Sequence, residues 1–228
     1  MIALCTVTCL IAWTQIDTKP EVLPLFDGKS LKGWTQDVPE NDGKPEALSP
    51  FVVREGMLVS LGKPLGHLIT EAEFENYRLL VEWRWPKGAG NSGVIVHVSQ
   101  PRFLRGFLPK GIEAQLMSGN AGDFHLFGEE MFRAEAPAEK AGKNLTDDSE
   151  KPLGEWNQMV VECLDDAIKV WVNGTLVNHG VKSSVRKGKI ALQSEGVEIE
   201  FRKVELTRLR PNSPQSWRER IDRPPSYF

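Results

Sequence analysis

The sequence has few cysteines. Two of the three, Cys5 and Cys9, lie in an N-terminal apolar segment, so removal of that segment leaves only Cys163 and no intramolecular disulfide. Cys163 stands in an apolar strand pattern, which favours a buried, inert thiol over a nucleophile. The stability of the domain must therefore come from its hydrophobic core.

An excess of positive charge is also missing. The chain has 28 Lys and Arg against 31 Asp and Glu, a net charge of −3, whereas a nucleic-acid-binding protein needs a basic face. We therefore expect no nucleic-acid partner. The sequence has no GxSxG motif, no HExxH zinc spacing and no glycine-rich phosphate loop after a strand. No cofactor is indicated with certainty, and a divalent metal stays open.

Long hydrophobic runs are absent as well. The first residues, MIALCTVTCLIAW, have the length of a signal-peptide hydrophobic region and are too short to span a bilayer. They lack a positively charged start and a clean cleavage site. We predict a signal-like leader over residues 1–20 and no transmembrane span. The protein is then exported to the periplasm or the cell surface, and a lipid anchor at Cys9 is an alternative.

The remaining chain shows the pattern of short strands and no long helical period. Hairpin turns are marked by Asn173-Gly174 and Glu195-Gly196. Residues 118–154 form a long polar insertion, and residues 211–228 form an Arg- and Pro-rich tail; we expect both to lie outside the strands. The sequence predicts one all-β sandwich of two antiparallel sheets over residues 21–210.

Strand parity places polar residues on the faces opposite the core. Three segments each carry such residues on one side: Tyr77–Trp85, Gly93–Val98 and Gly111–Met117. If these strands are neighbours, one concave surface would hold Glu82, Arg84, His97, Glu113 and Gln115. A solvated outer sheet face is the alternative. A Glu among apolar neighbours has a raised pKa, which suits a general acid or base.

Two histidines and the tryptophans are weaker candidates. His125 in the insertion would be able to close over a ligand, and His67 after a glycine turn would be able to face the same cleft. The chain has seven Trp against two Tyr. Tryptophan often stacks on sugar rings, although large core residues are the simpler interpretation for each one.

Seven segments together resemble a bacterial family described as 3-keto-disaccharide hydrolase, or 3-keto-glycoside lyase/hydratase. The resemblance covers about residues 23–209 and is carried, in order, by LFDGKSLKGW, EFENYRLLVEWRW, GNSGVIVHV, GIEAQLMSGNAGDF, EWNQMVVEC, VWVNGTLVN and GKIALQSEGVEIEFRKVELTRL. It implies a concanavalin A-like jelly-roll sandwich, export, and activity on glycosides oxidised at C3.

The resemblance also points to site residues. The family's acidic strand residue falls on Glu82, its Asn-Ser-Gly on Asn91 to Gly93, its Glu-x-Gln on Glu113 and Gln115, and its Asn-Ala-Gly-Asp loop on Asn120 to Asp123. This chain has His97 where many members have Arg. It also has Gln193-Ser194-Glu195 where many have Gln-x-His. These departures affect the choice of substrate and any metal that the missing histidine would support.

The resulting hypothesis is an exported hydrolase or lyase that acts on 3-keto-glycosides by removing the proton next to the ketone. Glu113 is the expected base, and Glu82 or His97 is its acid partner. The expected substrate-binding residues are Arg84, Asn91, Gln115, Asp123, His125, Gln193 and Glu195. The partner would be a glycoside or oligosaccharide. Alternatives are a non-catalytic carbohydrate-binding module, an ordinary two-carboxylate glycosidase and a structural domain of a cell-surface complex.

Overall fold

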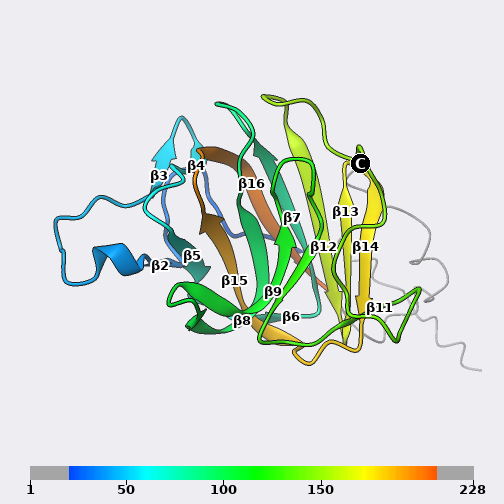
Figure 1. The fold of residues 1–228 in the computed structure, drawn as a ribbon. Coiled ribbons are helices and arrows are strands. Elements are labelled where there is room, and N and C mark those ends of the chain that lie inside the picture. The colour runs from blue at the N-terminus through cyan, green and yellow to red at the C-terminus, as the bar shows by residue number, and fades with distance from the viewer. Residues whose placement is uncertain (1–20, 210–228) are drawn as a thin grey trace, which may run out of the picture.

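The protein folds as two antiparallel sheets packed face to face (Figure 1). The computed structural model describes residues 21–209, so the expected leader and C-terminal tail lie outside the described residues. The nine-stranded sheet has the order β11 (Phe132–Arg133), β14 (Thr175–Val181), β13 (Ala167–Val172), β12 (Asn157–Leu164), β7 (Tyr77–Arg84), β16 (Ile199–Arg208), β4 (Met57–Ser60) and β3 (Phe51–Arg54), with β1 (Val22–Pro24) beside β16.

The seven-stranded sheet forms the other layer. Its order is β10 (Phe124–Phe127), β9 (Leu108–Gln115), β8 (Gly93–Leu104), β15 (Lys187–Ser194), β5 (Gly66–Thr70) and β2 (Trp34–Asp37), with β6 (Phe74–Glu75) beside β15. Within residues 21–209 the one helix is the 3-10 turn η1 (Pro39–Asn41), and no helix there is long and apolar enough to cross a membrane.

Alternating side chains from both sheets fill the space between them. Val81 and Trp83 of β7 point inward from the nine-stranded sheet, and Ile112 and Ala114 of β9 point inward from the seven-stranded sheet. All four are fully buried. Burial of a large apolar side chain contributes about 1.5–3 kcal/mol, so this core stabilises the domain. Cys163, the cysteine within residues 21–209, is buried and free.

Strands that are distant in sequence lie side by side. In the nine-stranded sheet β7 pairs with β12 and β16, and in the seven-stranded sheet β15 pairs with β8 and β5. This crossing of the chain between layers is the connectivity of a jelly roll. It confirms the predicted all-β sandwich of two antiparallel sheets.

The segment 118–154 is not wholly outside the sheets, contrary to the sequence prediction. Phe124–Phe127 is an edge strand paired with β9, and Phe132–Arg133 pairs with β14. Both strands are short and lie among polar residues, so the alternation of polar and apolar residues is too brief to predict a strand there. The segment therefore extends the seven-stranded sheet at the edge beside Glu113.

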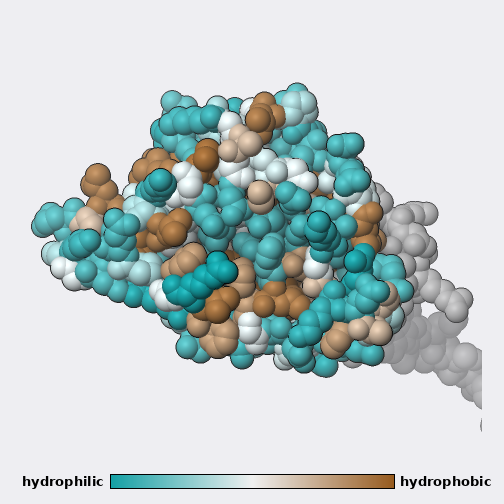
Figure 2. Space-filling model, in the orientation of Figure 1, coloured by the Kyte–Doolittle hydropathy of each residue, from teal (hydrophilic) through white to brown (hydrophobic). Residues whose placement is uncertain are grey.

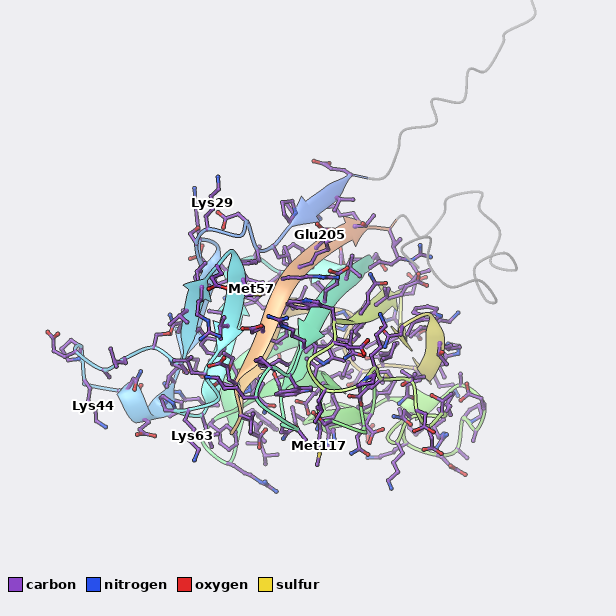
Figure 3. The ribbon with its side chains drawn as sticks, turned by 90° about the horizontal axis from the view of Figure 1, so that it is seen from above. Lys29, Lys44, Met57, Lys63, Met117 and Glu205 are labelled. Carbon is purple, nitrogen blue, oxygen red and sulfur yellow. The ribbon has the colours of Figure 1, made fainter. Side chains whose placement is uncertain are left out.

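The outer faces of the two sheets are separate surfaces. Seen from above, Glu205 of β16 and Met117, which follows β9, lie on opposite sides of the molecule (Figure 3). A side chain that points outward from one sheet is therefore separated by the whole core from one that points outward from the other.

Candidate active site

The outer face of the seven-stranded sheet carries a group of polar residues, most of them buried. In the ladder Ile95 pairs with Glu113, Gln193 pairs with His67, and Asn91 forms an isolated bridge with Glu195. Because side chains alternate, the neighbours of the inward-pointing Val94, Ile112 and Leu192 point outward. We call the outward group the polar floor; it consists of Asn91, Gly93, Glu113, Gln115, Gln193, Glu195 and His67.

Figure 2 looks onto this face of the molecule. The surface is hollowed in its middle and is lined there mainly by hydrophilic residues, while hydrophobic residues gather in its lower part. A concave face that carries convergent polar groups is a candidate ligand-binding surface.

The side chain of Glu113 folds over Gly93. A Cβ atom at position 93 would lie 1.9 Å from Glu113 Oε1 and 2.8 Å from its Cγ, so any other residue there would displace the carboxyl group. Glu113 is only 3% exposed in this position. The glycine of the Asn-Ser-Gly segment therefore has a definite role, which is to make room for Glu113.

The environment of Glu113 favours its neutral form. Burial and, to a smaller extent, the negative charge of Glu195 together raise the pKa of Glu113 to about 8. Its Oε1 atom has no hydrogen-bond partner among the described residues. Glu113 is therefore mostly protonated at neutral pH, and one of its oxygen atoms is buried without a partner among the described residues.

Two amide oxygens of the polar floor are also buried without a partner. These are Asn91 Oδ1 and Gln193 Oε1. Leaving such a group unpaired costs about 1–3 kcal/mol, and few are found in native proteins. Three unpaired oxygens on one face, including that of Glu113, indicate a surface that is completed by a ligand rich in hydrogen-bond donors.

Gln115 presents a donor to the same surface. Its Oε1 accepts hydrogen bonds from the backbone N–H groups of Leu116 (2.9 Å) and Met117 (3.1 Å). Its Nε2 is therefore turned to the other side, 3.4 Å from His125 Nε2. His125 is exposed on β10, directly opposite Glu113 in the ladder. The structure thus brings together Glu113, Gln115 and His125, as the sequence predicted.

A long hairpin forms one wall of the site. We call residues 99–107, at the end of β8 and the turn to β9, the strap. Arg102 in the strap donates to Asp37 Oδ1 of β2 (2.7 Å) and binds Asp42 with both terminal nitrogens. Since β2 is the far edge of the sheet, the strap crosses the face from β8 to that edge.

The strap also covers His67. The ring of Phe107 stacks on the imidazole of His67 with 6.3 Å between the ring centroids, and His67 is fully buried. Burial lowers the pKa of His67 to about 4, an effect that the backbone of Phe107 partly offsets. His67 is therefore neutral at physiological pH and borders the polar floor beside Gln193.

The expectation that Glu82 and Arg84 share a surface with Glu113 is wrong. Both lie on β7, which belongs to the nine-stranded sheet, and they point outward on the opposite side of the sandwich. Glu82 binds Arg202 at 2.5 Å and accepts a hydrogen bond from Gln158. Arg84 binds Glu200 at 2.6 Å. These residues belong to a surface ion-pair network.

His97 is not on the polar floor either. The alternation of β8 breaks after Val96, where His97 adopts a positive φ of 56° and the ladder shifts at a bulge. The imidazole lies edge-on to Tyr77 at 5.9 Å, in the core rather than beside Glu113. Burial lowers the pKa of His97 to about 4. Val98 is consequently on the outer face, where it packs with Ile95 and Ala191.

Asp123 supports a loop. Its Oδ1 accepts a hydrogen bond from the backbone N–H of Asn144 (2.7 Å), and Asn144 Nδ2 donates to the carbonyl of Ala121. The Asn120 to Asp123 turn is thereby fixed to the segment that follows β10. The contacts of Asp123 therefore indicate a structural role. Gln193 and Glu195, which were also expected at the site, do lie on the polar floor.

The described tryptophans do not line the site. Trp34, Trp83 and Trp85 are in the core. Trp156 lies on the nine-stranded sheet between Arg84 and Arg202, whose guanidinium carbons are 4.7 and 4.6 Å from its ring centroid. The simpler interpretation from the sequence, large packing residues, holds for these.

Sequence reasoning missed Phe107 and the purpose of Gly93, and it gave His67 little weight. Phe107 reaches the site only because the hairpin folds back over the sheet, which no local pattern reports.

Among residues 21–209, no three His, Cys, Asp or Glu side chains are grouped so that they could hold a metal. The divalent metal left open by the sequence has no such site in that part of the chain.

A family model described as the 3-keto-alpha-glucoside-1,2-lyase-like domain matches residues 21–207. The chain belongs to this family. The match spans both sheets and the whole polar floor, and it agrees with the resemblance carried by the seven sequence segments. A search of curated proteins finds no match.

Solved structures of similar fold include proteins that act on or bind carbohydrates. A putative glycosyl hydrolase from Parabacteroides distasonis has a TM-score of 0.60 and 20% identity over 83% of this chain and 94% of its own. A β-glucanase from Bacillus licheniformis has a TM-score of 0.51 and 12% identity over 85% and 100%. The carbohydrate-binding module CBM66 from Bacillus subtilis has 0.51 and 13% over 76% and 94%. These likenesses show the concanavalin A-like jelly-roll fold.

Proposed function

We propose that the protein is an enzyme that cleaves glycosides whose sugar carries a ketone at C3. It would do so by transfer of the proton at C2 and loss of the group at C1. The observation that carries this proposal is the buried Glu113 carboxyl group above Gly93, with an unpaired oxygen at the centre of a hollow polar face. Membership of a family described as 3-keto-alpha-glucoside-1,2-lyase-like supports this choice of substrate class.

The chemistry requires little besides proton transfer and hydrogen-bond donors. A ketone at C3 acidifies the hydrogen at C2, so a side chain of suitable pKa can remove it, and the resulting enolate expels the substituent at C1. An enolate oxygen is stabilised by donors that are already in place. Gln115 Nε2 is such a donor, because the Gln115 oxygen is held by two backbone N–H groups.

The unpaired acceptors of the floor suit a sugar. Hydroxyl groups on a pyranose ring would donate to Asn91 Oδ1 and Gln193 Oε1, and would thereby remove the cost of leaving these oxygens unpaired. The ring of Phe107 stacks on His67 of the polar floor, and Met117, which follows Gln115 by two residues, is exposed; apolar groups of this kind would suit the C–H face of a sugar. We propose further that the apolar N-terminal segment directs export, which would place the enzyme where glycosides from the environment arrive.

The decisive experiment is incubation with a 3-keto-glucoside or 3-keto-trehalose, before and after chelation, with detection of the released alcohol and the unsaturated ketosugar. Turnover is expected only with the oxidised glycosides. Turnover of the unoxidised disaccharide instead would indicate an ordinary glycosidase, and binding to glycans without turnover would indicate a binding module. Glu113→Gln should lose turnover while it stays folded; full activity in that variant would remove Glu113 from the mechanism.

A further inference from the structure

Glu195 is the second carboxyl group of the polar floor. It follows β15 and forms an antiparallel bridge with Asn91, which is two residues before the glycine that supports Glu113. Glu195 and Gln193 are two residues apart along the extended chain, so their side chains point to the same face of the sheet. The two carboxyl groups therefore lie at neighbouring positions on the same outer face. The negative charge of Glu195 contributes to the raised pKa of Glu113.

The turn that carries Glu195 is held firmly. The backbone N–H of Gly196 donates to the carbonyl of Gly62 (2.6 Å), and Ser194 Oγ donates to the carbonyl of Pro64 (3.1 Å). A Cβ at Gly62 would meet the backbone of Val197 at 2.5 Å, so the two loops are in close contact. These contacts fix the backbone position from which the Glu195 side chain starts.

The surroundings of the two groups differ. Glu113 is 3% exposed, whereas Glu195 is partly exposed and no hydrogen bond or ion pair of its side chain occurs among residues 21–209. His125 on β10 is opposite Glu113 in the ladder, and the neutral His67 on β5 lies farther along the polar floor, beside Gln193. Among residues 21–209, no cation is paired with either carboxyl group. Two carboxyl groups in unlike environments are a common basis for separate acid and base roles.

We propose that Glu195 is the base that removes the C2 proton and that Glu113 is the acid that protonates the departing oxygen at C1. This assignment rests on the proposed function and divides its proton transfers between two residues. It differs from the role of base that the sequence suggested for Glu113, and it gives a function to the residue at which this chain departs from the common family pattern.

The step balances without a further reactant. The carboxylate of Glu195 takes the proton from C2, and the electron pair of that C–H bond forms the enolate of the C3 ketone. The enolate then re-forms the ketone and a C1–C2 double bond, while the C1–O bond breaks. The departing oxygen takes its proton from Glu113. The glycoside becomes an alcohol and an unsaturated ketosugar, and a proton passes back from Glu195 to Glu113 before the next turnover.

The test compares Glu195→Gln and Glu113→Gln on two 3-keto-glucosides, one with a methoxy and one with a p-nitrophenoxy leaving group. Nitrophenolate departs without protonation. Glu113→Gln should therefore lose about 100-fold or more in kcat on the methyl glycoside and much less on the nitrophenyl glycoside. Glu195→Gln should lose about as much on both. The exposed Glu71→Gln is the matched control and should behave as the wild type on both.

A second readout follows the C2 proton alone. In D2O, exchange of deuterium into C2 of the methyl 3-keto-glucoside should persist with Glu113→Gln and stop with Glu195→Gln. Formate should restore part of the activity of Glu195→Ala, because it replaces the missing carboxylate. Activity of Glu195→Gln within twofold of the wild type on both substrates would overturn the assignment. If the wild-type protein turns over neither substrate, the proposed function fails and the assignment fails with it.

Discussion

The carboxyl group of Glu113 occupies the space that a side chain at Gly93 would fill. Gly93→Ala should therefore turn the carboxyl group away from the floor, since the end of a glutamate side chain moves more easily than the strands that hold it. We expect kcat/KM on a 3-keto-glucoside to fall about 100-fold or more, because small displacements of a reacting group are costly. The melting temperature, measured in parallel, should change by only a few degrees. Unchanged kinetics would show that the position of Glu113 above Gly93 is unimportant.

The pH dependence of the reaction distinguishes the two roles of Glu113. The pKa of Glu113 is raised to about 8 by burial and by the charge of Glu195. If Glu113 is the acid, kcat/KM on the methyl 3-keto-glucoside falls as the pH rises through about 8, because the proton needed by the leaving group is lost. A profile that rises through the same range would assign Glu113 as the base.

The same pKa predicts how stability varies with pH. The folded protein binds a proton at Glu113 more tightly than the unfolded chain, so the free energy of unfolding should decrease as the pH rises from the ordinary Glu range to about 8. The slope from this group approaches about 1.4 kcal/mol per pH unit. Chemical denaturation of Glu113→Gln, which stays neutral, should lack this component. Equal pH dependence in both proteins would contradict the burial of an ionisable Glu113.

His97 should contribute to stability and not to catalysis. It is 1% exposed, lies edge-on to Tyr77 and has a positive φ. His97→Ala removes a buried ring and should cost roughly 2–4 kcal/mol in the free energy of unfolding. Urea denaturation would measure this loss, and kcat/KM at a temperature where the variant is folded should stay within about twofold of the wild type. A large loss of kcat in the folded variant would return His97 to the site.

The ion pairs of the strap should affect binding more than chemistry. Arg102→Ala removes the contacts with Asp37 and Asp42 that hold the strap across the sheet. We expect KM to rise several-fold with little change in kcat, since Glu113 and Gln115 are held by other contacts. High salt should weaken substrate binding by the wild type in the same direction and have little further effect on the variant. An unchanged KM would show that the strap is held by packing alone.

Strand parity within one strand was sufficient to place Glu113 and Gln115 on the outer face of β9. It was not sufficient to say which strands are neighbours. β7 pairs with β12 and β16, which start about 80 and 120 residues later, so the sheet to which Glu82 belongs is decided by distant pairing. The prediction that His97 lies beside Glu113 was wrong for another reason. A single-residue bulge reverses parity, and at that bulge the His97 backbone lies so close to Gly188 that a Cβ there would come within 2.5 Å of it.

The strap is the part of the site that can change in length. It is a continuous loop between two paired strands, and its contacts with the rest of the protein are made by few side chains, among them Arg102, Phe103 and Phe107. The residues that would carry the chemistry lie on the sheet beneath it. Insertions or deletions in this loop can therefore reshape the wall of the hollow while the ladder below keeps its register. Lineages of this fold can in this way acquire a new sugar preference by exchanging one hairpin, without rebuilding the machinery on which turnover depends.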